Sequence, residues 1–219
     1  MGQQPRRLVD LAESATYSTA DAEFLDYYRH QLDLLAQMCQ EQQYLAIDPP
    51  PERKLLNISQ QLPAELVLKC MSDARLPSEV RASFTRLMLH LHVVRGSPLS
   101  AIRHARLWAD IPNEVKVQSY KTTSVEGYSD GGRARVGDQF ATDVLNTVES
   151  YLDSLRHSHP SGPVLQKDAA SVCTNKLTHE MVTLAKALAQ FGYYTFDDLL
   201  TLTENLLNIV DTSPHSAQT

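Results

Sequence analysis

The sequence contains little that would interrupt or cross-link a chain. Glycine (8) and proline (11) together make up 19 of 219 residues, and 42% of the residues are hydrophobic, which excludes a largely disordered chain. The three cysteines, Cys39, Cys70 and Cys173, are odd in number and widely spaced. This excludes a disulfide framework and predicts buried, reduced thiols. No Cys/His pair has the spacing of a zinc site, so neither a metal nor a cofactor is expected.

An excess of positive charge and long apolar runs are also missing. Twenty basic and 26 acidic residues give a formal net charge of −6, which argues against a protein that binds duplex nucleic acid. No apolar stretch approaches the ~18–20 residues that span a bilayer. Arg6 and Arg7 are not followed by the apolar segment of a signal peptide. These absences predict a soluble, cytoplasmic chain.

Apolar residues recur at helical spacing wherever a period can be recognised, and no stretch alternates as a strand does. We therefore predict an all-α fold. Six helical faces follow from the spacing: Phe24, Tyr28, Leu32, Leu35 and Cys39; Leu62, Leu66 and Cys70; Val80, Phe84, Leu87 and Leu91; Phe140, Val144, Val148, Tyr151 and Leu155; Leu177, Met181, Leu184 and Leu188; Leu199, Leu202, Leu206 and Val210.

Local signals place the ends of several of these helices. Ser18 or Thr19 caps the first, with Asp21 in its first turn, and Pro63 and Pro77 stand at the starts of two others. Gly192 suits the end of the fifth, and the run 195–198 resembles a capping box that opens the sixth. The predicted organisation is a lead-in at 1–17, a helical unit at 18–210 with loops at 48–57, 119–137 and 157–174, and a disordered tail at 211–219.

One segment has the pattern of a helical repeat. A short helix at 62–73 ends in a turn with Asp73, and a second helix at 77–93 opens near Arg81. HEAT and armadillo repeats have this order, in which the Asp bonds the next turn and the Arg reaches a neighbouring repeat. The pairs 62–73 with 77–93 and 178–191 with 196–210 predict a solenoid of degenerate repeats. Asp73 and Arg81 are the predicted polar pair between repeats.

No pattern of catalytic residues is present. His90 and His92 are two positions apart on a helix, so they point to different faces and are interpreted as structural. Trp108, near Arg103 and Arg106, is interpreted as a core tryptophan with solvated basic neighbours, although a cation–π or anion contact is the alternative. The glycine-rich run 127–137 lacks the ending of a phosphate-binding loop and a preceding strand, which favours a mobile loop. We predict that the chain is not an enzyme.

A set of short sequence words resembles the inositol 1,4,5-trisphosphate receptors. The words follow the order of that family over about residues 8 to 210: Tyr27–Leu32, Gln43–Ile47, Cys70–Asp73, Leu76–Pro77, Arg81–Phe84, Arg86–His90, His92–Val93, Ala105–Trp108, Ile111–Pro112, Asn175–Thr178, Phe191–Gly192 and Leu199–Leu200. The resemblance implies a piece of a tetrameric calcium-release channel of the endoplasmic reticulum, from the first cytosolic armadillo solenoid. Its implied partners are neighbouring domains and subunits of the channel, with protein regulators in addition.

The resemblance also implies what this segment lacks. The matched stretch follows the ligand-binding core and precedes the pore, so by itself it is expected neither to bind inositol trisphosphate nor to conduct calcium. Its implied role is to carry motion from the ligand core towards the gate. Residues 48–56 stand as an insertion relative to the family. Val94 and Gly96 replace residues that tend to be acidic, so no calcium-binding role is assigned to that turn.

Three hypotheses follow in order of preference. The first is a fragment of the channel that acts as a coupling solenoid. The second is a free-standing helical-repeat adaptor that binds channel subunits or other proteins. The third, a remote one, is an enzyme that handles phosphate through the loop at 127–137.

Overall fold

The computed structural model describes residues 6–43, 47, 57–94, 139–158 and 171–210. Within these ranges all regular structure is helical and no strand occurs, which confirms the predicted all-α class. The elements are α1 (Leu8–Ser14), α2 (Thr19–Met38), η1 (Gln40–Gln42), α4 (Ile58–Gln61), α5 (Ala64–Ser72), α6 (Ser78–Met88), η3 (Leu89–Val93), α8 (Gln139–Ser158), α9 (Val172–Gln190) and α10 (Phe196–Val210).

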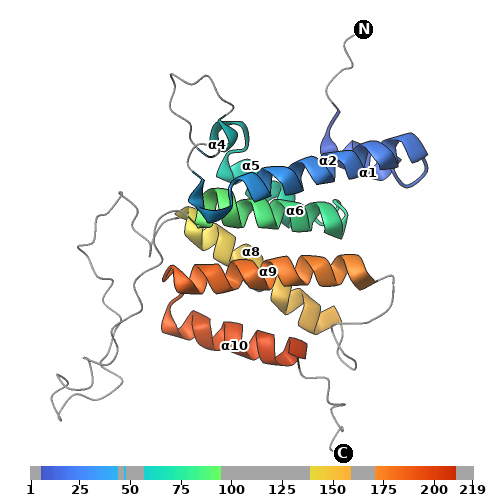
Figure 1. Cartoon of the computed structure of the whole chain (residues 1–219). Coiled ribbons are helices and arrows are strands. Elements are labelled where there is room, and N and C mark those ends of the chain that lie inside the picture. The colour runs from blue at the N-terminus through green and yellow to red at the C-terminus, as the bar shows by residue number, and fades with distance from the viewer. Residues whose placement is uncertain (1–5, 44–46, 48–56, 95–138, 159–170, 211–219) are drawn as a thin grey trace, which may run out of the picture.

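Helix α6 lies at the centre of the packing. It contacts α2 on one side, α9 on the other, and α5, from which it is separated by a short turn. Helix α8 contacts α9, α10 and α5. In Figure 1, α2, α6, α9 and α10 follow one another as successive rows, with α2 and α10 at the two ends. Distant parts of the sequence therefore meet in one stack of helices.

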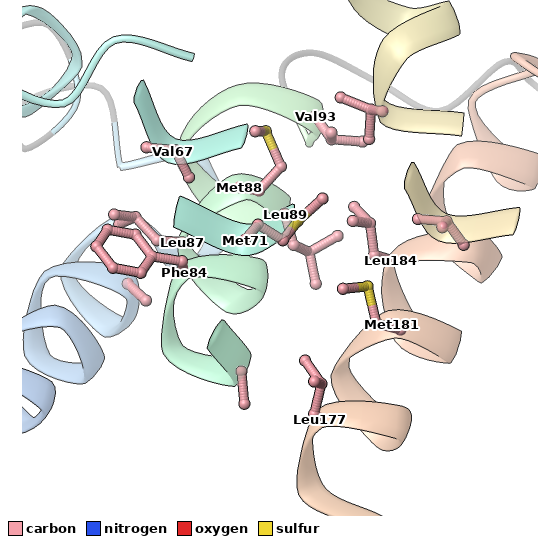
Figure 2. Packing of buried hydrophobic residues seen from close by; sticks show 14 of the residues in the cluster. Val67, Met71, Phe84, Leu87, Met88, Leu89, Val93, Leu177, Met181 and Leu184 are labelled. Carbon is pink, nitrogen blue, oxygen red and sulfur yellow. The ribbon is translucent and has the colours of Figure 1, made fainter. Parts of the chain in front are cut away.

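The buried side chains form one continuous core. Figure 2 shows its centre, where Phe84 and Leu87 of α6 lie on one side, Met181 of α9 lies on the other, and Met71 of α5 and Met88 of α6 lie in the middle. All five are at most 1% exposed. The predicted face of α6 (Val80, Phe84, Leu87 and Leu91, the last in η3) is buried, as is that of α9 (Leu177, Met181, Leu184 and Leu188).

The predicted helix ends are confirmed by hydrogen bonds and dihedral angles. The Ser18 hydroxyl accepts a bond from the Asp21 amide at 3.3 Å and caps α2. Thr195 and Asp198 bond each other reciprocally at the start of α10: the Asp198 carboxylate accepts from the Thr195 amide at 3.0 Å, and the Asp198 amide donates to the Thr195 hydroxyl at 3.3 Å. Gly192 follows α9 with φ of 73°, a left-handed conformation that favours glycine.

Three predicted faces need correction. On α2, Phe24 is exposed and Leu25 is buried; on α5, Leu66 is exposed and Val67 and Met71 are buried. On α10, Leu199 and Val210 are exposed, and Leu202, Asn205 and Ile209 point inward. These helices carry apolar residues on more than one face, so periodicity finds a stripe without showing which stripe packs.

The structure also contains helices that the sequence patterns did not predict. Helix α1 occupies part of the predicted lead-in and packs on α2, and α4 is a single turn before α5. Residues 89–93 form a π-helical turn closed by the Val94 amide on the Leu89 carbonyl at 2.8 Å. Helix α8 extends to Ser158 and α9 begins at Val172, so both ends of the predicted loop 157–174 are helical, and residues 159–170 lie outside the described part of the chain. The segments 48–56, 119–137 and 211–219, and Trp108 with its basic neighbours, lie outside the described residues.

Candidate functional site

The residues weighed for metal binding do not come together in the described part of the chain. His92 is buried, and its Nε2 lies 2.9 Å from the Leu62 carbonyl, while its ring stands edge-on to Phe140. His90 is half-buried; burial lowers its pKa, and the nearby positive charge of Arg86 lowers it further. Among the described residues no group of three or more His, Cys, Asp or Glu side chains has metal-binding geometry.

Asp73 and Arg81 have different hydrogen-bond partners. Asp73 Oδ1 accepts from the Arg75 amide at 3.0 Å, and its carboxylate also pairs with the Arg75 guanidinium. Arg81 Nε donates to the Met71 carbonyl at 2.9 Å, at the end of α5. Its guanidinium also lies 5.7 Å from the centre of the Tyr151 ring on α8. Asp73 thus bonds the turn that follows it, and Arg81 reaches a neighbouring helix.

A second set of polar residues crosses three helices. We call it the Arg86 ladder, and it comprises Arg29 and Asp33 of α2, Ser83 and Arg86 of α6, and Glu180 of α9. Arg86 Nε donates to Glu180 Oε1 at 3.1 Å, and its Nη2 also bonds that oxygen. On its other side, Arg86 Nη1 lies 3.4 Å from Asp33 Oδ1. One guanidinium therefore ties α9 to α2 through α6.

The remaining members hold Asp33 in place. The Ser83 hydroxyl donates to Asp33 Oδ1 at 2.8 Å, and Arg29 Nη1 donates to Asp33 Oδ2 at 3.3 Å. Arg29 also pairs with Asp26 one turn earlier, with 2.7 Å between Nη2 and Oδ1. Both oxygens of Asp33 are thus bonded, as a poorly solvated carboxylate requires.

The ladder is shielded from water at its α9 end. The Glu180 side chain is only 6% exposed and that of Arg86 26%. Burial works to lower the pKa of Arg86, but the bond to Glu180 and the charges of Glu180 and Asp33 outweigh it, so the pKa rises. Charges in such surroundings favour one arrangement of the three helices, because displacing one partner leaves the other buried and unpaired.

Helical spacing did not predict this ladder, although the sequence contains a signal for it. Glu180 lies on the same side of its helix as Leu177, Met181 and Leu184, so it is a charge inside an apolar stripe. A carboxylate there needs a buried cationic partner. Which cation supplies it does not follow from spacing, since Arg86 is 94 residues away in the chain.

The described residues form an all-helical stack joined by the Arg86 ladder. None of the helices in this part of the chain is long and apolar enough to cross a bilayer. No family model matches the chain. It is 64% identical over 213 residues to the inositol 1,4,5-trisphosphate receptor itr-1 of Caenorhabditis elegans. The resemblance to inositol 1,4,5-trisphosphate receptors is thereby confirmed, and the chain corresponds to a segment of such a receptor. The match covers 97% of this chain and 7% of the length of that relative.

Proposed function

We propose that this chain is a coupling segment of an inositol 1,4,5-trisphosphate-gated calcium-release channel, on the cytosolic face of the endoplasmic reticulum. The identity to the nematode receptor supports the channel assignment. In this proposal, residues 18–210 together with α1 form one stretch of an armadillo-like solenoid. The segment carries movement of the ligand core towards the pore through contacts between successive helices.

The observation that carries the coupling role is the double engagement of Arg86. Its guanidinium bonds Glu180 of α9 and lies against Asp33 of α2, so α2, α6 and α9 are tied by one side chain. A rotation of α2 relative to α6 therefore strains the Arg86 guanidinium, which also holds α9 through Glu180. Arg81 adds a second link, because it bonds the end of α5 and covers Tyr151 of α8. Tyr151 in turn bonds Thr178 of α9, with 2.9 Å between the two hydroxyl oxygens.

The test is Arg86→Gln in an intact receptor, expressed in cells without native receptors. We expect inositol trisphosphate to bind as before, while calcium release requires a several-fold higher concentration of it. Arg75→Gln is the matched control: it removes the same charge from an exposed ion pair with Asp73, and release should be unchanged. Wild-type release from Arg86→Gln receptors present at wild-type levels would overturn the coupling role.

A free-standing helical adaptor is the second candidate, and the exposed apolar surface of α10 fits it as well as it fits the channel segment. Phe196, Leu200, Leu207 and Val210 are each more than half exposed on this end helix. In the solenoid proposal, further helices of the receptor cover them; in an adaptor, a partner protein does. An immunoblot of membranes and cytosol with an antibody to residues 62–93 decides between the two. A single very large membrane-associated band supports the channel segment, and a cytosolic band near 24.5 kDa supports the adaptor.

A further inference from the structure

Methionine is concentrated at one place in the core. Met71 of α5, Met88 of α6 and Met181 of α9 are each 0% exposed, whereas Met38, the other methionine in the described part of the chain, is 46% exposed on α2. Figure 2 shows Met71 and Met88 in the middle of the core and Met181 on the side of α9. We call these three residues the methionine centre. Each comes from a different helix, so the set lies where α5 and α6 meet α9.

Methionine packs differently from the apolar side chains around it. It is unbranched, has three rotatable bonds and carries a polarizable sulfur, so it fills irregular spaces in several ways of similar energy. Leucine and valine, the branched side chains of much of the surrounding core, have well-defined rotamers and specify one arrangement. A contact that methionines form from three helices therefore tolerates a small shift of one helix, which would leave a void between branched side chains.

The polar contacts next to the methionine centre are compatible with such a shift. Thr85 Oγ1 of α6 lies 4.0 Å from Met181 Sδ, but it also donates to the Arg81 carbonyl at 2.9 Å within its own helix. Because a hydroxyl has one proton, the shorter bond satisfies it, and the contact with the sulfur can change without leaving a buried donor unpaired. Glu180, the residue before Met181, stays tied to Arg86, whose long side chain has room to follow a small movement.

The helix that carries Met88 changes its winding directly after this residue. Helix α6 ends at Met88, and the next five residues form the π-helical turn that the Val94 amide closes on the Leu89 carbonyl. Such turns are rare and are found frequently at functional sites. Nε2 of His92 in this turn lies 2.9 Å from the Leu62 carbonyl, so the far end of the turn is fixed to the chain between α4 and α5. The methionine centre thus lies beside an irregular turn that also contacts α9.

We propose that the methionine centre is a deformable joint, at which α9 shifts against α6 by on the order of 1–2 Å while the core stays closed. The methionines accommodate the shift, and the Arg86 ladder limits it, because a larger movement leaves Glu180 buried without its partner. The joint itself is a property of this chain. Its use in a receptor, where it lets movement pass from α6 to α9, rests on the proposed coupling function.

The first test compares the whole 219-residue chain with a triple variant, Met71→Leu with Met88→Leu and Met181→Leu. Leucine keeps the apolar volume and removes the flexibility. We expect NMR relaxation dispersion to detect microsecond-to-millisecond exchange of the α9 amides in the wild-type chain, and the exchange contribution to fall at least about twofold in the triple variant.

Met38→Leu is the matched control, since it makes the same substitution outside the core, and it should leave the exchange unchanged. If circular dichroism of the triple variant differs from that of the wild type, Met181→Leu alone takes its place. Exchange of the α9 amides that is absent from the wild-type chain, or equally large in the folded leucine variant, would overturn the joint.

The second test places the same substitutions in an intact receptor, in the cells used for Arg86→Gln. We expect inositol trisphosphate to bind as before and calcium release to require at least about threefold more of it, because the leucines favour the present arrangement of the helices over the shifted one. Met38→Leu should not change release. If Arg86→Gln alters release and the leucine variant does not, the coupling function holds and the role of the joint in it is wrong. If neither alters release, the coupling function fails, and the NMR result alone decides whether the joint exists.

Discussion

Arg86 on α6 and Glu180 on α9 are 94 residues apart in sequence, yet Arg86 Nε lies 3.1 Å from Glu180 Oε1 in the interior of the stack. Glu180 is nearly inaccessible to water, and Asp33 shares the guanidinium from the opposite side. The pair therefore connects helices that the chain itself separates. This connection is the basis of the proposed coupling role, and its energetic contribution can be measured in the isolated chain.

Removing one member of this pair should destabilise the chain more than removing both. We expect Arg86→Met to lower the free energy of unfolding by about 2–4 kcal/mol, because Glu180 stays buried without its partner. The double variant with Glu180→Met should recover at least about 1 kcal/mol of that loss. Urea unfolding of the four chains of the double-mutant cycle gives the coupling energy. Additive losses would show that the two side chains do not act as a pair.

Two phenylalanines distinguish the buried from the exposed faces. Phe84 is 1% exposed on α6 and Phe24 is 57% exposed on α2. We expect Phe84→Ala to lower the free energy of unfolding by about 3–5 kcal/mol, because it loses buried apolar surface and leaves a cavity. Phe24→Ala should change the free energy of unfolding of the monomer by no more than about 0.5 kcal/mol. Thermal or urea unfolding at low micromolar concentration measures both. Equal losses of unfolding free energy in the two variants would mean that Phe24 belongs to the core, as its spacing alone predicted.

The buried hydroxyl of Tyr194 lowers the stability of the fold. In the described part of the chain its oxygen has no hydrogen-bond partner although the residue is 8% exposed. Burial raises the pKa of this phenol, and the charges of Glu149 and Asp198 raise it further. We expect Tyr194→Phe to be neutral or to stabilise the chain by up to about 1 kcal/mol, because it removes an unsatisfied polar group and keeps the ring. A loss above about 1 kcal/mol would reveal a partner for the hydroxyl.

The turn after α5 contains a carboxylate with a strongly altered pKa. Hydrogen bonds from the side chain and amide of Arg75 lower the pKa of Asp73 from 3.8 to about 2. Because the folded pKa is the lower one, the stabilisation by Asp73 is complete above about pH 4 and is lost as the pH falls towards 2. NMR titration of the carboxyl carbon should show this, and Arg75→Gln should move the pKa back towards 3.8. An unchanged pKa of Asp73 in Arg75→Gln would show that Arg75 is not what lowers it.

Helix boundaries could be predicted because their signals are local. Ser18, Gly192 and the Thr195–Asp198 pair act within a few residues through hydrogen bonds and backbone angles, and each has the predicted role in the structure. The faces of α6 and α9 were also predictable, because each has one dominant apolar stripe that the stack buries on both sides. The family likewise followed from words in the sequence alone.

The tertiary structure decided which face of each end helix is buried in the core. Helices α2 and α10 each have one apolar stripe that is buried and another that is exposed, and periodicity treats the two alike. It also decided the partners of the charged residues: Arg81 bonds Met71 and covers Tyr151, and Arg86 joins Asp33 to Glu180. The sequence by itself determined the six longer helices, several of their ends and the family, because these depend on short-range chemistry. Contacts between residues some 50 to 95 positions apart depend on how the helices stack, and only the folded chain shows them.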